Sequence, residues 1–198
     1  RINATTNSAP SIKDIRVYSR DPNQTGSMTM SINMTAGASY AYTASATGAS
    51  SVTLSAATVL QVTGKYGTAT ITLSNGLTSA QTRAAINAYS EVTGVSAIKG
   101  ANDRLVFMST TKGSDAFVSV TEISGATQLQ AVNNSKVSGS DAQVLVNGER
   151  ANAQGTVVYA STNGVSLSFN LADDTVGSTR TITINGGGAT FQLGADSR

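Results

Sequence analysis

The 198-residue chain contains no cysteine, no histidine and no tryptophan, and only 12% of its residues are charged. Without histidine and cysteine it cannot form a Ser-His-Asp or Cys-His catalytic set, and most zinc, copper and haem sites are excluded as well. The absence of histidine also removes the side chain that titrates nearest to neutral pH. Most nucleophilic enzymes and the common metalloproteins are therefore excluded, and a cysteine-free chain gives no indication of its redox compartment.

Charge and hydropathy argue against two further classes of partner. The formal net charge of +2 is too small to indicate nucleic acid binding, and we interpret Lys13, Arg16 and Arg20 as the solvated edge of a strand. No apolar run approaches the roughly 20 residues that cross a bilayer, and no signal peptide is visible. We therefore expect neither nucleic acid nor a membrane as partner. Because the chain begins at Arg1 and ends at Arg198 without an initiator Met, we expect it to be a fragment of a longer protein.

The remaining polar groups that could carry chemistry are scattered along the chain. Asp173 and Asp174 form the only adjacent acidic pair, and paired carboxylates can flank a glycosidic bond or bind calcium. Their Ala-Asp-Asp-Thr-Val-Gly context is typical of a polar turn between strands. The other candidates lack the spacing or surroundings of a calcium loop, a desolvated amine or a phosphate loop; they are Asp103, Asp115, Asp141, Glu149, Lys65, Lys99, Lys112 and the run Gly186-Gly187-Gly188.

From this inventory we assign no catalytic, cofactor-binding or metal-binding residue, and we predict that the protein is not an enzyme. A glycosidase that uses carboxylates alone is the enzyme class that the composition leaves open, and it would need two carboxyl groups about 5–10 Å apart in a cleft. We expect no cofactor.

Alternation of apolar and polar residues with a period of two is the dominant pattern of the chain. Such runs are typical of strands with one buried and one solvent-exposed face, and the abundance of Thr, Val and Ile favours the same structure. Asn-Gly pairs supply the positive φ angles that tight turns require, and the pair Asn147-Gly148 is expected to join two paired strands. The alternating runs are 28–34, 69–73, 165–171 and 182–184, and the Asn-Gly pairs stand at 75–76, 147–148 and 163–164.

One helix is predicted between residues 78 and 94. Thr78 can cap its start, with Gln81 three positions later completing a capping box. Gly94 is a natural C-terminal stop. The residues expected to share its buried face at helical spacing are Thr82, Ala85, Ile86, Tyr89 and Val92.

The fold class that follows is mainly β with one or two short helices, a β-rich α+β protein of two small packed subdomains of short antiparallel strands. We predict three segments. Residues 1–57 are β-rich, with a loop-rich or weakly packed stretch at 36–57 that is almost entirely Ala, Ser, Thr, Gly and Tyr. Residues 58–126 have the order strand, strand, helix and three strands. Residues 127–198 form a β-rich subdomain that begins with a polar connection at 127–139.

A signature follows the predicted strand at Leu105–Met108. The segment Ser109–Val120 reads Ser-Thr-Thr-Lys-Gly-Ser-Asp-Ala-Phe-Val-Ser-Val, and it resembles the hook-type insertion motif of bacterial flagellins and hook-associated proteins. Residues 141–148 and 164–169 also resemble segments of flagellins and filament cap proteins. The ending Gly188–Ala195 resembles the Phe-Gln-Leu/Val-Gly-Ala segment of flagellins, which favours flagellin over the cap protein.

The resemblance implies that the chain is the surface-exposed outer region of a flagellin without its terminal helices. It would then be an extracellular structural part of the flagellar filament that supports motility. Its partners would be other flagellin subunits, contacted through the missing helices, so that the isolated chain should be monomeric. Its exposed Ser and Thr side chains could carry O-linked glycans, as in flagellins of this kind. The alternatives are a filament cap or hook-associated protein and, in another class, a surface adhesin or carbohydrate-binding β-domain.

Overall fold

The chain is divided into two compact units, and the first of them is discontinuous in sequence. Unit 1 combines Arg1–Gly37 with Ala142–Arg198, and unit 2 is Ala38–Asp141. All strand pairs in the described part of the chain are antiparallel. The computed structural model describes residues 2–6, 11–44, 53–101, 104–125, 135–172 and 175–186.

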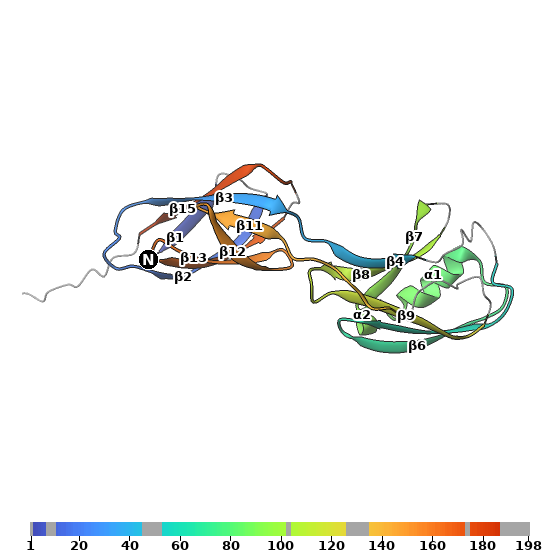
Figure 1. Ribbon diagram of the computed structural model, residues 1–198. Helices are drawn as coiled ribbons and strands as arrows, with labels where there is room; N and C mark the ends of the chain where they lie inside the picture. Colours follow the sequence, from blue (N-terminus) through green and yellow to red (C-terminus); the bar gives the residue numbers. More distant parts are fainter. Residues whose placement is uncertain are drawn as a thin grey trace, which may run out of the picture. The chain divides into compact units, whose positions relative to one another are not determined.

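Unit 1 is one 8-stranded sheet with the order β1-β15-β3-β11-β12-β13-β14-β2 (Figure 1). The sheet curls until its two end strands, β1 and β2, contact each other. Its interior can therefore be filled by one face of every strand. The strands are β1 (Asn3–Thr6), β2 (Ile12–Arg20), β3 (Met28–Ala36), β11 (Gln143–Val146), β12 (Glu149–Gln154), β13 (Val157–Thr162), β14 (Val165–Leu171) and β15 (Thr179–Asn185).

The predicted alternation positions the core of unit 1. Met30, Ile32 and Met34 of β3 are fully buried, whereas Thr29 and Ser31 on either side of Met30 are exposed. On β15, Ile182 is paired with Met30 and is also fully buried. Burial of such side chains stabilises the unit by about 1.5–3 kcal/mol for each one fully removed from water.

The turns of unit 1 follow the Asn-Gly prediction. Asn147 and Gly148 have φ angles of 51° and 84° and join β11 to β12, which pair as expected. Asn163 and Gly164 have φ angles of 51° and 73° and join β13 to β14. Two consecutive positive φ angles are the geometry of the type I′ turn, whose twist matches that of the flanking strands.

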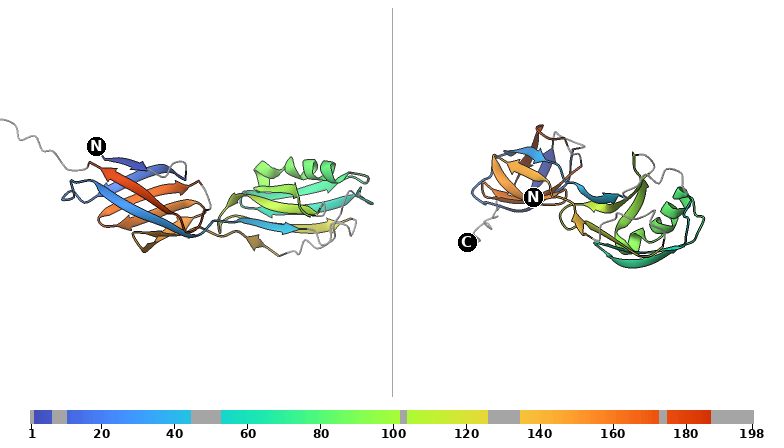
Figure 2. Two further views of the ribbon diagram at one scale, coloured as in Figure 1. Left: turned by 90° about the horizontal axis from the view of Figure 1, so that it is seen from above. Right: turned by 45° about the vertical axis from the view of Figure 1, so that its right-hand side comes forward.

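Unit 2 contains two small sheets and two short helices (Figure 2). One sheet has the order β10-β9-β5-β6 and the other the order β4-β8-β7. The helices pack on neighbouring strands, α1 against β7 and β6, and α2 against β5, β6 and β7. The elements are β4 (Tyr40–Ala44), β5 (Thr58–Gly64), β6 (Gly67–Leu73), α1 (Ser79–Asn87), α2 (Ser90–Thr93), β7 (Val95–Lys99), β8 (Leu105–Lys112), β9 (Phe117–Ser124) and β10 (Val137–Ser138).

The order predicted for residues 58–126 is confirmed, and the Ser109–Val120 signature connects the two sheets of unit 2. It runs from β8 in one sheet to β9 in the other through Gly113, whose φ is 118°. The core beneath both sheets includes Leu60, Phe107 and Val120, all fully buried. In the described part of the chain, no helix has the length and apolar composition needed to span a membrane.

The predicted helix is present but interrupted. The capping box forms, because Thr78 accepts the Gln81 N–H and the Gln81 side chain accepts the Thr78 N–H. However, α1 ends at Asn87, whose side chain pairs with both backbone groups of Ala97 in β7 at 2.6 and 3.1 Å. Residues 88 and 89 form a turn, and α2 follows it and ends at Gly94 with φ 73° as predicted.

The interruption corrects the predicted buried face. Thr82 and Ile86 are buried and Ala85 packs against the core, but Tyr89 is 40% and Val92 55% exposed. These two residues lie beyond the point where α1 ends, so that helical spacing counted from Thr82 no longer applies to them.

The unit boundaries also differ from the linear segments. They fall at 37/38 and 141/142 rather than at 57/58 and 126/127. The reason is that β3 pairs with β11 and β15, although all of unit 2 separates them from β3 in the sequence. The stretch 36–57 is less loosely packed than expected where it is described. Ala41 of β4 is fully buried, β4 pairs with β8, and Leu54 belongs to the core. Residues 45–52 and most of the polar connection predicted at 127–139 lie outside the described residues.

Candidate functional site

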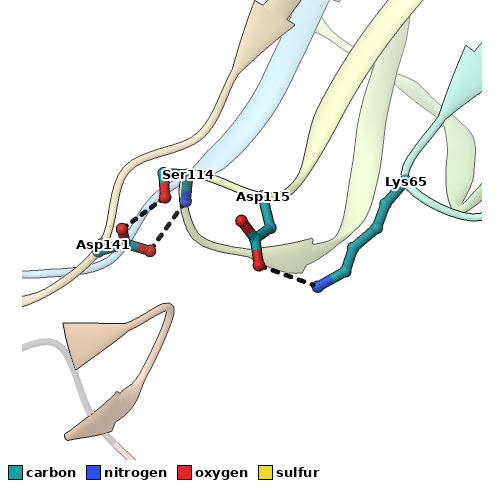
Figure 3. Close-up of polar contacts among 4 residues, drawn as sticks. All are labelled: Lys65, Ser114, Asp115 and Asp141. Atoms are coloured by element: carbon teal, nitrogen blue, oxygen red, sulfur yellow. Dashed lines mark hydrogen bonds and ion pairs between the residues drawn. The ribbon is translucent and has the colours of Figure 1, made fainter.

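The structure brings together two of the acidic residues considered from the sequence. Asp115 and Asp141 lie on either side of Ser114 at the end of unit 2 where the chain passes to unit 1 (Figure 3). Glu149 is separate, at the start of β12 in unit 1. The candidates Asp103, Asp173, Asp174, Gly187 and Gly188 lie outside the described residues, as does the Gly188–Ala195 segment.

Asp141 caps the turn between β8 and β9. Its Oδ1 accepts the Ser114 N–H at 2.9 Å, and its Oδ2 accepts the Ser114 hydroxyl at 2.5 Å (Figure 3). Hydrogen bonds to a carboxylate are stronger than those between neutral groups. Asp141 is the last residue of unit 2, so this contact attaches the departing chain to a turn 27 residues earlier.

A second attachment lies beside the first. Ser39, the second residue of unit 2, forms an antiparallel bridge with Ser140, and their hydroxyls lie 2.9 Å apart. Gly139 packs against this bridge so closely that a Cβ on it would lie 2.4 Å from the Ser39 carbonyl oxygen and 2.6 Å from that of Gly113. The entering and leaving segments of unit 2 are thus held together by Ser39, Gly113, Gly139 and Ser140, which with Ser114 and Asp141 we call the crossover cluster.

The lysines considered as amine nucleophiles occupy the surface. Lys65 forms an ion pair with Asp115 at 3.9 Å, with both side chains 40% or more exposed (Figure 3). Lys112 lies over the Tyr40 ring, with its Nζ 5.2 Å from the ring centre. Lys99 ends β7 and is exposed. Lys65 and Lys112 thus contact side chains of neighbouring segments at the surface, and these surroundings are not those of an activated amine.

The arrangement gives Asp115 and Asp141 structural partners rather than a substrate. Across the described ranges, no group of three or more His, Cys, Asp and Glu side chains could hold a metal ion. The crossover cluster keeps the two ends of unit 2 side by side.

Replacing Asp141 by alanine is expected to destabilise unit 2 by about 1.5 kcal/mol, since the variant loses two hydrogen bonds to a charged acceptor that is only partly buried. Lys65→Ala is the matched control. Its exposed ion pair should contribute below about 1 kcal/mol. Urea denaturation followed by NMR signals of unit 2 measures both, and equal losses in the two variants would contradict the assignment.

Glu122 on β9 is an acidic residue whose surroundings change the pKa of its carboxyl. Desolvation by burial raises the pKa of its carboxyl above the ordinary value of 4.5, and its Oε2 is buried without a hydrogen bond. A carboxyl whose pKa is raised in the folded state stabilises it below the unfolded-state pKa, and that contribution is lost as the pH rises through the folded-state pKa.

Glu122→Gln, which mimics the protonated form, should therefore be slightly more stable than the native chain at pH 7, by on the order of 0.5 kcal/mol. The difference should shrink as the pH falls through the raised folded-state pKa of Glu122, and it should vanish only well below 4.5, where the carboxyl is protonated in both the folded and the unfolded chain. Thermal unfolding across this range provides the measurement. A stability difference that stays constant with pH would exclude titration of Glu122 as its cause.

A feature not anticipated from the sequence lies on the outer face of unit 1. Tyr18 of β2 and Tyr159 of β13 are 61% and 45% exposed, and they line two adjoining shallow grooves of about 230 and 210 Å³. Ser168 of β14 lies between their strands and is buried, although its position in the alternating run predicts exposure. The cause is the Tyr18 hydroxyl, which lies 2.8 Å from the Ser168 Oγ. Tyr at outward positions of alternating strands was the signal available in the sequence.

No protein-family model matches the chain, and no curated protein matches it. Solved structures do match in fold. The D2-D3 domains of the flagellar cap protein FliD from Escherichia coli are 20% identical with a TM-score of 0.57, covering 93% of this chain and 98% of that one. FliD from Bdellovibrio bacteriovorus is 17% identical with a TM-score of 0.57, covering 91% and 99%. FliD from Pseudomonas aeruginosa PAO1 is 21% identical with a TM-score of 0.54, covering 87% and 84%.

These similarities bear on the flagellar resemblance of the sequence. All three structures are flagellar cap proteins, whereas the sequence segments favoured flagellin. At identities below 25% the comparisons show a shared fold, and the hook-type insertion motif stays a prediction.

Proposed function

We propose that this chain is the outer, two-unit part of a flagellar filament cap protein, a non-enzymatic structural component located outside the cell. The observation that carries the proposal is the coverage of the fold comparison. The similarity extends over 93% of this chain and 98% of the Escherichia coli D2-D3 domains, so both units are included.

The internal chemistry of the chain supports a structural role. The carboxylates of Asp115 and Asp141 make contacts within unit 2, and both units have cores of tightly buried aliphatic and aromatic side chains. A module with two well-packed cores is suited to presenting a surface, and its function is then determined by that surface rather than by the fold. Partners in this proposal are other flagellar subunits, and the isolated chain is monomeric. Its exposed Ser and Thr hydroxyls remain available for O-linked glycans.

The second candidate is the outer region of a flagellin. It is favoured by the Ser109–Val120 signature, which connects the two sheets of unit 2, and by the similarity of Gly188–Ala195 to a flagellin segment. The two candidates differ in where and in how many copies the protein occurs on a filament.

Immunogold electron microscopy of the source cells, with antibody raised against this chain, separates the candidates. Gold confined to filament tips is expected for the cap protein. Gold along the whole filament would replace the proposal by flagellin, and gold at the hook junction would indicate a hook-associated protein. Gold on the cell wall alone would exclude a flagellar role and favour an adhesin.

A further inference from the structure

We propose that the grooved outer face of unit 1 binds an uncharged hexose unit of an oligosaccharide. The face is formed by β13, β14 and β2, which are neighbours in the sheet. The inference concerns unit 1 alone and does not depend on the proposed function.

The aromatic part of the groove has a fixed geometry. Tyr159 is paired with Ser168, and Ser168 is paired with Arg16, so the three side chains form one row across three strands. Tyr18 follows on the same strand as Arg16, with its hydroxyl held by Ser168 at 2.8 Å. Two largely exposed tyrosine rings thus flank the groove, and one of them is positioned before any ligand arrives. Tyrosine offers a large contact area at low conformational-entropy cost, and its ring face attracts the partly positive C–H groups of a pyranose.

A bulge in β2 adds a pair of charges to the same face. Between the pairs Lys13–Asn170 and Arg16–Ser168, two residues of β2 oppose Phe169 alone, and one of them, Asp14, has a φ of 53°. Bulges of this kind re-aim side chains at the edge of a sheet. Asp14 and Arg16 both line the groove, and within the described residues neither makes an ion pair with another side chain.

One residue lining the groove has an unsatisfied acceptor. Asn170 lines the groove, and its Oδ1 is buried without a hydrogen bond. A buried polar atom without a partner costs roughly 1–3 kcal/mol. A ligand hydroxyl entering beside Asn170, together with a small rotation of the amide, would supply the missing donor.

These groups match a neutral sugar better than the other ligand classes. Adjacent hydroxyls of a hexose can donate to the Asp14 carboxylate and accept from the Arg16 guanidinium, whereas an anion would meet Asp14 and a cation would meet Arg16. A groove of about 230 Å³ that is open to solvent has room for one sugar ring, with the rest of the glycan outside. An apolar peptide would remove the polar groups of Asp14, Arg16 and Asn170 from water without offering them hydrogen-bond partners.

The test is an NMR titration of the ¹⁵N-labelled chain with the methyl glycosides of glucose, galactose and mannose, and with neutral trisaccharides built from them. We expect millimolar binding of at least one hexose, with shift changes centred on Tyr18, Tyr159 and Asn170. Tyr159→Ser should weaken that binding at least tenfold. Tyr42→Ser is the control, because Tyr42 is also an exposed strand tyrosine, 65% exposed, and it lies in unit 2 outside the groove.

The possible outcomes decide the proposal. Should none of the neutral sugars perturb groove signals at 50-fold excess over the chain, on the order of 10 mM, the proposal is overturned. The same holds if Tyr159→Ser binds as tightly as Tyr42→Ser, or if sialylated or sulfated sugars bind more tightly than neutral ones. Groove signals that shift with protein concentration alone would replace the sugar by a second copy of the chain. Tyr159→Phe keeps the ring and should retain binding, which controls for loss of folding.

Discussion

Truncation of Phe107 to alanine is expected to destabilise unit 2 by about 3–5 kcal/mol, the largest effect of any substitution considered for this chain. Phe107 lies in the middle of β8, where it is paired with Ala97 of β7 and Thr43 of β4, and its side chain is fully buried. Small residues surround it in its own sheet, so the cavity cannot be filled by a neighbour without moving backbone. The cost therefore includes both the lost transfer free energy and the cavity.

Because each unit has its own core, the effect should be confined to unit 2. Denaturant titration monitored by NMR reads out both units in one sample. Phe169→Ala is the reciprocal variant, since Phe169 is buried in unit 1, and it should lower the midpoint for unit 1 signals. A loss below about 1 kcal/mol for Phe107→Ala, or an equal shift of unit 1 signals, would contradict this division of the core.

Gly139→Ala is expected to cost about 3 kcal/mol, near the upper end of the range for overpacked sites. The added Cβ would lie 2.4 Å from the Ser39 carbonyl oxygen, 2.6 Å from that of Gly113 and 3.2 Å from the Ala41 backbone nitrogen. All three obstacles are backbone atoms, so no side chain can rotate away. The Ser39–Ser140 bridge must open to make room, and the hydrogen bond from Gly139 N–H to the Ala116 carbonyl is put at risk with it.

Gly26→Ala serves as the control, because a Cβ on Gly26 would meet no atom within 4 Å and the residue has no positive φ. Its free energy of unfolding should change by less than about 0.5 kcal/mol. Hydrogen exchange at Ser39, Gly113 and Ser140 adds a local readout, and it should accelerate in Gly139→Ala. Unchanged protection at these amides would show that the cluster accommodates the methyl group, contrary to the expectation.

Local patterns predicted the elements of this fold well. The alternation at Met30, Ile32 and Met34 gave β3 its buried face, and the Thr78-Gln81 capping box and Gly94 gave the limits of the helical region. These features depend on neighbours within a few residues, which a sequence displays directly.

Contacts between residues far apart in the sequence could not be predicted from local patterns. The Asn87 side chain ends α1 by pairing with Ala97 in β7, and no periodicity of residues 78–94 contains that information. Likewise, Ser168 is buried because Tyr18, 150 residues earlier, covers it. The same limit affected the candidate sites. Asp115 and Asp141 looked scattered because the contact that brings Asp141 to Ser114, the neighbour of Asp115 in sequence, spans 27 residues.

The discontinuity of unit 1 has a consequence for the order of events on the ribosome. β3 emerges early, but its partner β11 cannot be reached until the whole of residues 38–141 has been synthesised. Unit 2 is continuous, so it can acquire its structure while the second half of unit 1 is still missing. Once it has, the Ser39–Ser140 bridge reduces the long connection between β3 and β11 to a short effective loop, which lowers the entropy lost when those strands meet. Folding of unit 2 thus brings the two halves of unit 1 together before they pair.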